Sequence, residues 1–385
     1  MFTQQPPSCY AKIDSQMTYV LLLVGLVILV VGAELLVRGS VTLAAFAGVS
    51  PLIIGLTVVA FGTSAPELAV SSVSSLKGDS EIALGNVIGS NICNILLILG
   101  ISAVIVPLTV SSQLVRLDVP VMIASSLAVW GTGYDGAITR VEGILLFLGF
   151  VLYTIYMIRK GRREEASRRS AIELEPDFLA HPTLSIGQAT LNAVYILIGL
   201  GMLVLGAQLL VDSAVKIATE FGISEIVIGL TIVAIGTSLP ELATSVVAAM
   251  KGQRDLAVGN AVGSNMFNLM IVLPAAAVLS PAGVPVTTSV LWFDLAVMAM
   301  IALICWPIFI SRSTVSRFEG AVMLMLFAAY TAILVAEATN YDSVQTLKTG
   351  YSIFILPAVI AVVSIAALIH IRDGRSESAV AQTKT

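Results

Sequence analysis

A stretch of 40 residues occurs twice in this chain, and the duplication constrains the fold more than any other feature. Residues 55–94 align without a gap to residues 229–268, and 23 of the 40 paired positions are identical. Each copy carries a Pro-Glu pair in an otherwise apolar run, with Glu67 in the first and Glu241 in the second. The duplication predicts two equivalent halves, each contributing one carboxylate to a site at their interface.

The apolar runs around the duplicated stretch predict a membrane protein. Hydrophobic residues make up 57% of the 385 residues, charged residues only 11%, and the mean hydropathy is +0.97. Many runs approach the roughly 20 apolar residues that a spanning helix needs. Ionisable groups inside such runs are costly, so Glu67 and Glu241 are candidates for a functional site. The scattered cysteines show no metal-ligand spacing, and no GxxxxGK[ST] motif is present. We therefore expect no cofactor, no nucleotide and no nucleic-acid partner.

The hydropathy pattern predicts eleven spans in an all-α membrane protein. Five spans fall in each half, and an odd number makes the second half enter the membrane from the opposite side, as an inverted repeat. One extra C-terminal transmembrane helix has no partner in the first half. The predicted segments are an N-terminal tail (1–17), repeat 1 (18–158), a basic cytoplasmic linker (159–185), repeat 2 (186–337), the extra span (338–371) and a C-terminal tail (372–385).

The basic residues predict the orientation of these spans. With the N-terminus outside, 15 of the 20 lysines and arginines fall on the cytoplasmic side, six of them in the linker. Cytoplasmic loops carry an excess of Lys and Arg, so this split favours an external N-terminus and a cytoplasmic C-terminus.

Oxygen-bearing groups accompany each glutamate at helical spacing. Pro66 cannot donate a backbone hydrogen bond, so we expect local unwinding that frees carbonyl groups beside Glu67. Sites made only of oxygen suit hard cations such as Ca²⁺ and Na⁺. The candidate residues are Glu67 with Ala60, Thr63 and Ser64; Glu241 with Ala234, Thr237 and Ser238; and Ser90, Asn94, Ser264 and Asn268 from the third and eighth spans.

Several other polar or small residues have structural explanations. We expect four glycines to permit close helix packing, two aspartates to lie at the membrane interface, and one glutamate to lie at a helix end. Two asparagines either join helices or contact the ion, and the sequence does not separate these roles. The glycines are Gly85, Gly89, Gly259 and Gly263; the aspartates are Asp118 and Asp294; the glutamate is Glu34; and the asparagines are Asn86 and Asn260.

The two motifs GTSAPEL…GNVIGSNICN and GTSLPEL…GNAVGSNMFN resemble the alpha repeats of the cation/calcium exchanger superfamily, in particular its prokaryotic sodium/calcium exchanger membrane proteins. The resemblance covers the ten repeat-forming spans and implies a prokaryotic cell (inner) membrane. It implies Glu67 and Glu241 as the central calcium ligands. Family members often carry Asp where this chain has Asn268, which removes one carboxylate. Further contacts that the resemblance implies are the side chains of Thr63, Thr237, Ser64, Ser238, Ser90 and Ser264 and the backbone carbonyls of Ala60 and Ala234.

The predicted function is therefore a secondary-active antiporter that exchanges Ca²⁺ for Na⁺ by alternating access at a two-glutamate site, and not an enzyme. An exchanger that moves H⁺ or K⁺ is the nearest alternative, because glutamates carry protons as well as ions. A cation channel also uses acidic residues. An intramembrane hydrolase would need a nucleophile–base pair, for which Ser64 near Glu67 is the only indication.

Overall fold

The computed structural model describes residues 9–47, 50–172, 186–223, 232 and 234–382, and it is almost entirely helical. Nine helices in these ranges are long and apolar enough to cross a membrane, and a bent pair over residues 51–77 makes a tenth. The predicted seventh span, 218–249, is described only in part, because residues 224–231 and 233 lie outside these ranges. The chain is thus a multi-pass membrane protein of the predicted all-helical class.

Most elements of the first half recur in the same order among the described residues of the second half, which do not include residues 224–231 and 233. The first half comprises α1 (Cys9–Ala47), α2 (Pro51–Ile54), η1 (Gly55–Val59), α3 (Ala60–Thr63), α4 (Ala65–Lys77), α5 (Ser80–Ile92), η2 (Cys93–Leu99), α6 (Gly100–Ile105), β1 (Leu108–Thr109), η3 (Leu114–Asp118), α7 (Val119–Thr132), η4 (Gly133–Asp135), β2 (Ala137–Ile138) and α8 (Arg140–Ile172). The second comprises α9 (Ile186–Glu220), α11 (Ala234–Gly236), α12 (Leu239–Met250), α13 (Arg254–Phe267), η6 (Asn268–Val272), α14 (Leu273–Leu279), β3 (Val284–Pro285), η7 (Val290–Leu295), α15 (Ala296–Arg312), β4 (Thr314–Val315) and α16 (Arg317–Ala338). The extra span comprises α17 (Val344–Thr349), η8 (Gly350–Ile355) and α18 (Leu356–Gln382).

The four short strands join the halves reciprocally. β1 pairs antiparallel with β4, with Leu108 opposite Val315, and β2 pairs antiparallel with β3, with Ile138 opposite Val284. Each two-stranded sheet therefore takes one strand from each half. This exchange is the arrangement that an inverted repeat predicts.

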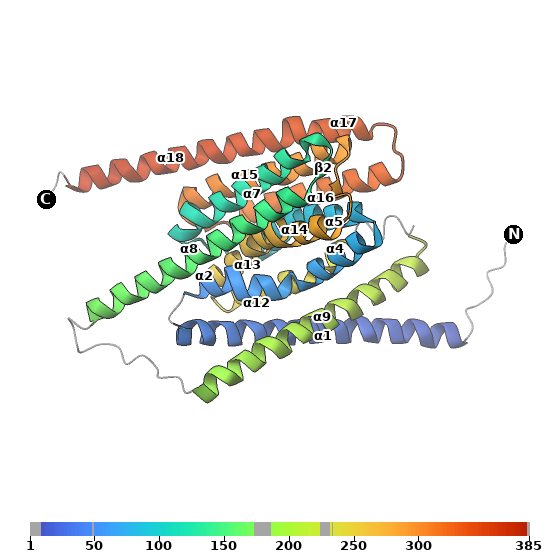
Figure 1. Ribbon diagram of the computed structural model, residues 1–385, viewed down its shortest axis with the longest axis horizontal. Helices are drawn as coiled ribbons and strands as arrows, with labels where there is room; N and C mark the ends of the chain where they lie inside the picture. The colour runs from blue at the N-terminus through green and yellow to red at the C-terminus, as the bar shows by residue number, and fades with distance from the viewer. Residues whose placement is uncertain (1–8, 48–49, 173–185, 224–231, 233, 383–385) are drawn as a thin grey trace.

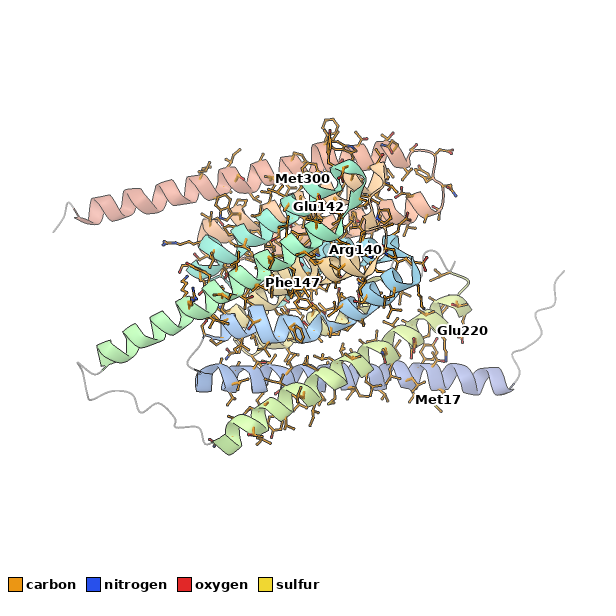
Figure 2. The ribbon with its side chains drawn as sticks, viewed as in Figure 1. Met17, Arg140, Glu142, Phe147, Glu220 and Met300 are labelled. Carbon is orange, nitrogen blue, oxygen red and sulfur yellow. The ribbon has the colours of Figure 1, made fainter. Side chains whose placement is uncertain are left out.

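Helices α1 and α9 cross on one side of the bundle, and α18 lies on the opposite side (Figure 1). Met17 near the start of α1 and Glu220 at the end of α9 lie toward the same end of the molecule (Figure 2), so the two helices run antiparallel. Glycines allow their backbones to touch: a Cβ added at Gly206 would lie 2.6 Å from the backbone nitrogen of Leu29. This close crossing is typical of small residues at membrane helix interfaces.

The expected break in the second span is present. α3 ends at Thr63, α4 begins at Ala65, and the two parts of the span are bent by 45°. Ser64 between them has φ −85° and ψ 10°, and Ser238 in the second half has φ −88° and ψ 6°. Proline in the first turn of α4 and of α12 explains both breaks, since its ring is tolerated there but not within a continuous helix.

Helices also extend into segments that the sequence assigns to tails and linker. α1 begins at Cys9, α8 continues to Ile172 and α18 continues to Gln382. The residues of α8 beyond the apolar run are rich in Arg, Glu and Ala, which have high helix propensity. Residues with high helix propensity can therefore extend a spanning helix into water, even though the extension has no apolar face to bury.

Candidate cation-binding site

Glu67 on α4 and Glu241 on α12 lie at the interface between the two halves, and each is held by a residue of the other half. The Ser64 hydroxyl donates to Glu241 Oε1 over 2.8 Å, and the Ser238 hydroxyl donates to Glu67 Oε1 over 3.3 Å. Ser90 on α5 adds a second donor to Glu67 Oε1, at 3.4 Å. Both glutamates are at most 1% exposed. The structure thus brings Ser64, Ser90 and Ser238 together with the glutamates.

Several buried oxygens at this interface have no hydrogen-bond partner among the described residues, and four of them are carboxylate or amide oxygens of candidate ligands. These four belong to the four residues that the duplicated motif singles out most strongly, one carboxylate and one amide from each half. Buried polar atoms in folded proteins are nearly always paired, so unpaired ones indicate an absent ligand or water. The atoms are Glu67 Oε2, Glu241 Oε2, Asn94 Oδ1 and Asn268 Oδ1.

Among the described residues, no ion pair to Glu67 or Glu241 is found. Ion pairs in this part of the chain, such as Lys251 with Glu34 and Lys348 with Glu337, lie away from both glutamates. Two carboxylates in a dry site are stable only when a cation or protons neutralise them. The site therefore has the charge and the ligand atoms to hold a hard cation.

The remaining candidate residues occupy the same region with different roles. The Thr63 hydroxyl donates to the Val59 carbonyl at 3.0 Å, whereas the buried Thr237 hydroxyl has no partner in the described residues. Ser264 is fully buried. The Ala60 carbonyl is not freed, since it accepts the Ser64 N–H at 3.0 Å.

At the second break the backbone differs from the first. The Ser238 N–H donates to the Ile235 carbonyl at 3.0 Å rather than to that of Ala234. The two carbonyls that we expected to be equivalent, those of Ala60 and Ala234, therefore have different surroundings in this structure.

Asn86 and Asn260 join helices. Asn86 Nδ2 donates to the Glu67 carbonyl at 3.2 Å and to the Ser71 hydroxyl at 3.0 Å. Asn260 Nδ2 makes the same two bonds in the second half, to the Glu241 carbonyl at 3.3 Å and to Ser245 at 3.0 Å. Of the two roles that the sequence leaves open, the structure shows the structural one: each asparagine fixes the backbone that carries a glutamate.

Asn91 and Asn265, the asparagines of the duplicated GSN motif, are site residues that sequence reasoning missed. Asn94 Nδ2 donates to Asn265 Oδ1 at 3.0 Å, and Asn265 Nδ2 donates to the Asn91 carbonyl at 3.2 Å. Asn265 thereby orients the Asn94 amide and leaves its oxygen facing the site. The sequence signal that could have identified both asparagines is the occurrence of GSN in each copy of the duplicated stretch. No equivalent bond in the described residues holds Asn268, whose amide atoms are both unpaired.

A cavity of about 540 Å³ opens beside the site, between α5 of the first half and η7 and α16 of the second. We call it the α5 cavity; its wall includes Val70, Gly85, Asn86, Gly89, Thr237, Thr287, Asp294, Tyr330 and Leu334. The packing expected at Gly85 and Gly89 is not found, because Gly85 is exposed and Gly89 half-buried on this wall. At Gly263, by contrast, an added Cβ would lie 2.8 Å from the Leu56 Cα. The expected packing therefore holds for the second copy only.

The two aspartates that we expected at the membrane interface each accept a hydrogen bond from a tyrosine of the same half. Asp118 is 0% exposed and accepts hydrogen bonds from the Tyr153 hydroxyl at 2.8 Å and from Gln113 at 3.4 Å. A tyrosine 35 residues downstream can satisfy a buried carboxylate, which a linear reading does not reveal. Its equivalent, Asp294, accepts from the Tyr330 hydroxyl at 3.0 Å and lines the α5 cavity.

Comparison with known proteins agrees with this architecture. Residues 17–159 and 191–336 match the sodium/calcium exchanger protein family. The sodium/calcium exchanger MaX1 of Methanosarcina acetivorans is 31% identical over 346 residues, covering 82% of this chain and 98% of MaX1. The inner membrane protein YrbG of Escherichia coli K12 is 39% identical over 293 residues, covering 74% and 88%.

Solved structures of the sodium–calcium exchanger NCX_Mj have the same fold. One of them superimposes with a TM-score of 0.70 at 31% identity, covering 83% of this chain and 99% of NCX_Mj. Matches of this extent cover both halves of the repeat. The chain is a cation-exchanging membrane protein that belongs to the sodium/calcium exchanger family.

Proposed function

We propose that this protein is a secondary-active antiporter that exchanges Ca²⁺ for Na⁺ across the membrane by alternating access at the Glu67–Glu241 site. The observation that carries the proposal is that Glu67, Glu241, Asn94 and Asn268 each have a buried oxygen without a partner among the described residues, one carboxylate and one amide oxygen from each half. The names of the relatives MaX1 and NCX_Mj support the choice of Ca²⁺ and Na⁺.

Charge balance explains why the two ions compete for one site. Two carboxylates neutralise one Ca²⁺ or two Na⁺, and removing either charge leaves a bound divalent ion half compensated in a poorly hydrated environment. Thr63, Ser64, Ser90 and their equivalents would complete the coordination with hydroxyl oxygens, and Ala60 and Ala234 with backbone carbonyls. Because Ca²⁺ and two Na⁺ cannot occupy the same carboxylates together, entry of one expels the other.

The test is uptake of ⁴⁵Ca²⁺ into proteoliposomes with imposed Na⁺, K⁺ and pH gradients. With the membrane potential clamped at zero, an outward Na⁺ gradient should drive Ca²⁺ uptake against its own gradient, which a channel cannot do. Glu67→Gln and Glu241→Gln should each abolish this uptake while inserting normally, and Glu220→Gln, an exposed glutamate at the end of α9, should not. Near-normal exchange by either site variant would overturn the assignment.

Proton-coupled exchange of Ca²⁺ or Na⁺ is the second candidate, and one observation favours it. The buried carboxylates have no basic partner in the described residues, so they require either metal ions or protons. Ca²⁺ uptake driven by a pH gradient in sodium-free vesicles, and lost in Glu67→Gln, would establish this alternative.

The basic residues support an external N-terminus and a cytoplasmic C-terminus, and we propose the cell (inner) membrane as the location. In this orientation the α5 cavity opens to the outside, because its wall includes the start of α5 and the segment between β3 and η7. The structure then corresponds to an outward-open arrangement.

A further inference from the structure

A second cavity lies between the extra span and the second half of the repeat, and none of its lining residues belongs to the cation site. Its volume is about 260 Å³, and its walls come from α15, α16 and α18. α15 and α16 contribute buried side chains, those of Ile304, Ile308, Met323 and Leu326. α18 contributes four residues between 358 and 363. We call this space the α18 groove.

The lining of the α18 groove suits hydrocarbon rather than water or an ion. It is apolar apart from Glu319, whose carboxylate already accepts the Ser316 N–H and hydroxyl at 2.7 Å each. Apolar cavities stay dry and take apolar ligands. Phe318 and Val362 on the walls are exposed, and both lie in membrane-spanning helices. The groove therefore opens toward the bilayer, whose apolar component is the lipid acyl chain.

The extra span creates this groove, because the equivalent surface of the first half is open. α8 corresponds to α16 with an offset of 177 residues, as the matched sequences RVEG and RFEG at their starts show. The offset maps Phe318 to Val141 and Val322 to Leu145. Both first-half residues are more than 60% exposed. The first half therefore provides a natural reference surface, with the same helix but without the covering span.

Basic residues lie at one end of the α18 groove. This end is the first turn of α16, where Phe318 and Glu319 follow Arg317. Only residues 339–343 separate α16 from the span formed by residues 344–369, so α16 and α18 run antiparallel. The last part of α18, which carries Arg372 and Arg375, therefore lies toward the same end. In the proposed orientation this end faces the cytoplasm.

We propose that the α18 groove binds one anionic phospholipid of the cytoplasmic leaflet, with an acyl chain between α16 and α18 and the phosphate at Arg317. Arg317 is exposed, and its bond to the Ile105 carbonyl, at 3.4 Å, uses only one of the five guanidinium N–H groups. Guanidinium groups bind phosphate through paired hydrogen bonds. Basic residues between spanning helices on the cytoplasmic side are typical sites for anionic headgroups. The proposal takes only the choice of leaflet from the orientation, and it does not depend on which ions are exchanged.

Retention of lipid by the purified protein tests the proposal. The protein is reconstituted in vesicles of equal parts dioleoylphosphatidylglycerol and dioleoylphosphatidylcholine, extracted again in detergent, and analysed by native mass spectrometry. One phosphatidylglycerol should remain bound per protein, in several-fold excess over phosphatidylcholine. Equal retention of the two lipids, or an uncharged lipid bound in their place, would overturn the proposal.

Two pairs of variants separate the acyl chain from the headgroup. Val322→Trp should fill the groove and lower the bound phosphatidylglycerol several-fold, whereas Leu145→Trp at the equivalent exposed position should not. Arg317→Gln should remove most of the preference for phosphatidylglycerol, whereas Arg116→Gln, at an exposed arginine of η3 that is also expected on the cytoplasmic side, should keep it. Unchanged retention in Val322→Trp, or unchanged preference in Arg317→Gln, would refute the site.

A photoreactive lipid makes the test independent of whether a variant folds. Phosphatidylglycerol with a diazirine on its acyl chain is irradiated in the same vesicles with the unmodified protein. Attachment should concentrate on residues 318–326 of α16 and 358–363 of α18, and exceed that on Leu23 and Val27, exposed apolar residues of α1. Attachment spread evenly over α1, α16 and α18 would show general contact with the bilayer and overturn the proposal.

Discussion

Replacing Asn260 with alanine should destabilise the protein far more than replacing Asn86, although both asparagines make the same two hydrogen bonds. Asn260 is 0% exposed, so Asn260→Ala leaves the Glu241 carbonyl and the Ser245 hydroxyl without this donor in a dry environment. A buried group that loses its partner costs about 1–3 kcal/mol, which gives roughly 2–6 kcal/mol for the pair. Asn86 lines the α5 cavity, where water replaces the lost donor, so Asn86→Ala should cost about 1 kcal/mol.

Thermal unfolding of the purified protein in detergent measures this difference. One kcal/mol shifts Tm by about 2–4 °C in domains of 150–250 residues, and by less in a longer chain, so Asn260→Ala should lower Tm by several degrees and Asn86→Ala by about one. Asn192→Ala is the matched control, because Asn192 is buried and, among the described residues, its side-chain amide donates to the Gln188 carbonyl of its own helix. Equal shifts for Asn86→Ala and Asn260→Ala would refute the argument that hydration of the cavity distinguishes the two sites.

Three further predictions follow from the site, the topology and the packing. Asn268→Asp should raise the apparent Na⁺ affinity, because two glutamates alone balance only two Na⁺; a 3:1 exchange ratio from reversal potentials, with Na⁺ affinity unchanged in the variant, would show that charge counting fails. Single cysteines at Ser170 and Ser378 should label from the cytoplasmic side and one at Thr3 from outside; labelling of Ser170→Cys and Thr3→Cys from one side would refute the orientation. Gly263→Ala should lower the yield of folded protein, since its Cβ would lie 2.8 Å from Leu56, whereas Gly89→Ala on the cavity wall should be tolerated; size-exclusion profiles that match would contradict this.

The duplication allowed the helical fold, the broken second span and the convergence of Glu67 with Glu241 to be predicted. It did so because two copies of one motif must occupy equivalent positions in an inverted repeat. The cross-half bonds from Ser64 to Glu241 and from Ser238 to Glu67 were not predictable, since equivalence does not say which groups touch across the interface.

Differences between the halves were the main failure of sequence reasoning. Gly89 and Gly263 occupy equivalent positions in the duplicated motif, yet one lines a cavity and the other is covered, because a single conformation breaks the symmetry of the repeat. The hydrogen bond from Tyr153 to Asp118 was not predictable for another reason: Tyr153 lies on a different helix, and a linear pattern contains no record of that contact.

Of the two Asp–Tyr pairs, Asp118–Tyr153 and Asp294–Tyr330, the described residues of the extra span lie beside the second. Lys348 on α17 is 5% exposed, donates to Ser289 at 3.0 Å, pairs with Glu337 and lies 4.9 Å from the centre of the Phe293 ring, next to Asp294. In the first half the position equivalent to Glu337 is occupied by Lys160. The lysine of the first half therefore belongs to the repeat itself, whereas Lys348 of the second half comes from the extra span. The extra span thereby gives the two equivalent copies different neighbours. Under the proposed alternating access, substitutions in α17 and α18 would shift the relative free energies of the outward- and inward-facing states while the ion ligands stay unchanged.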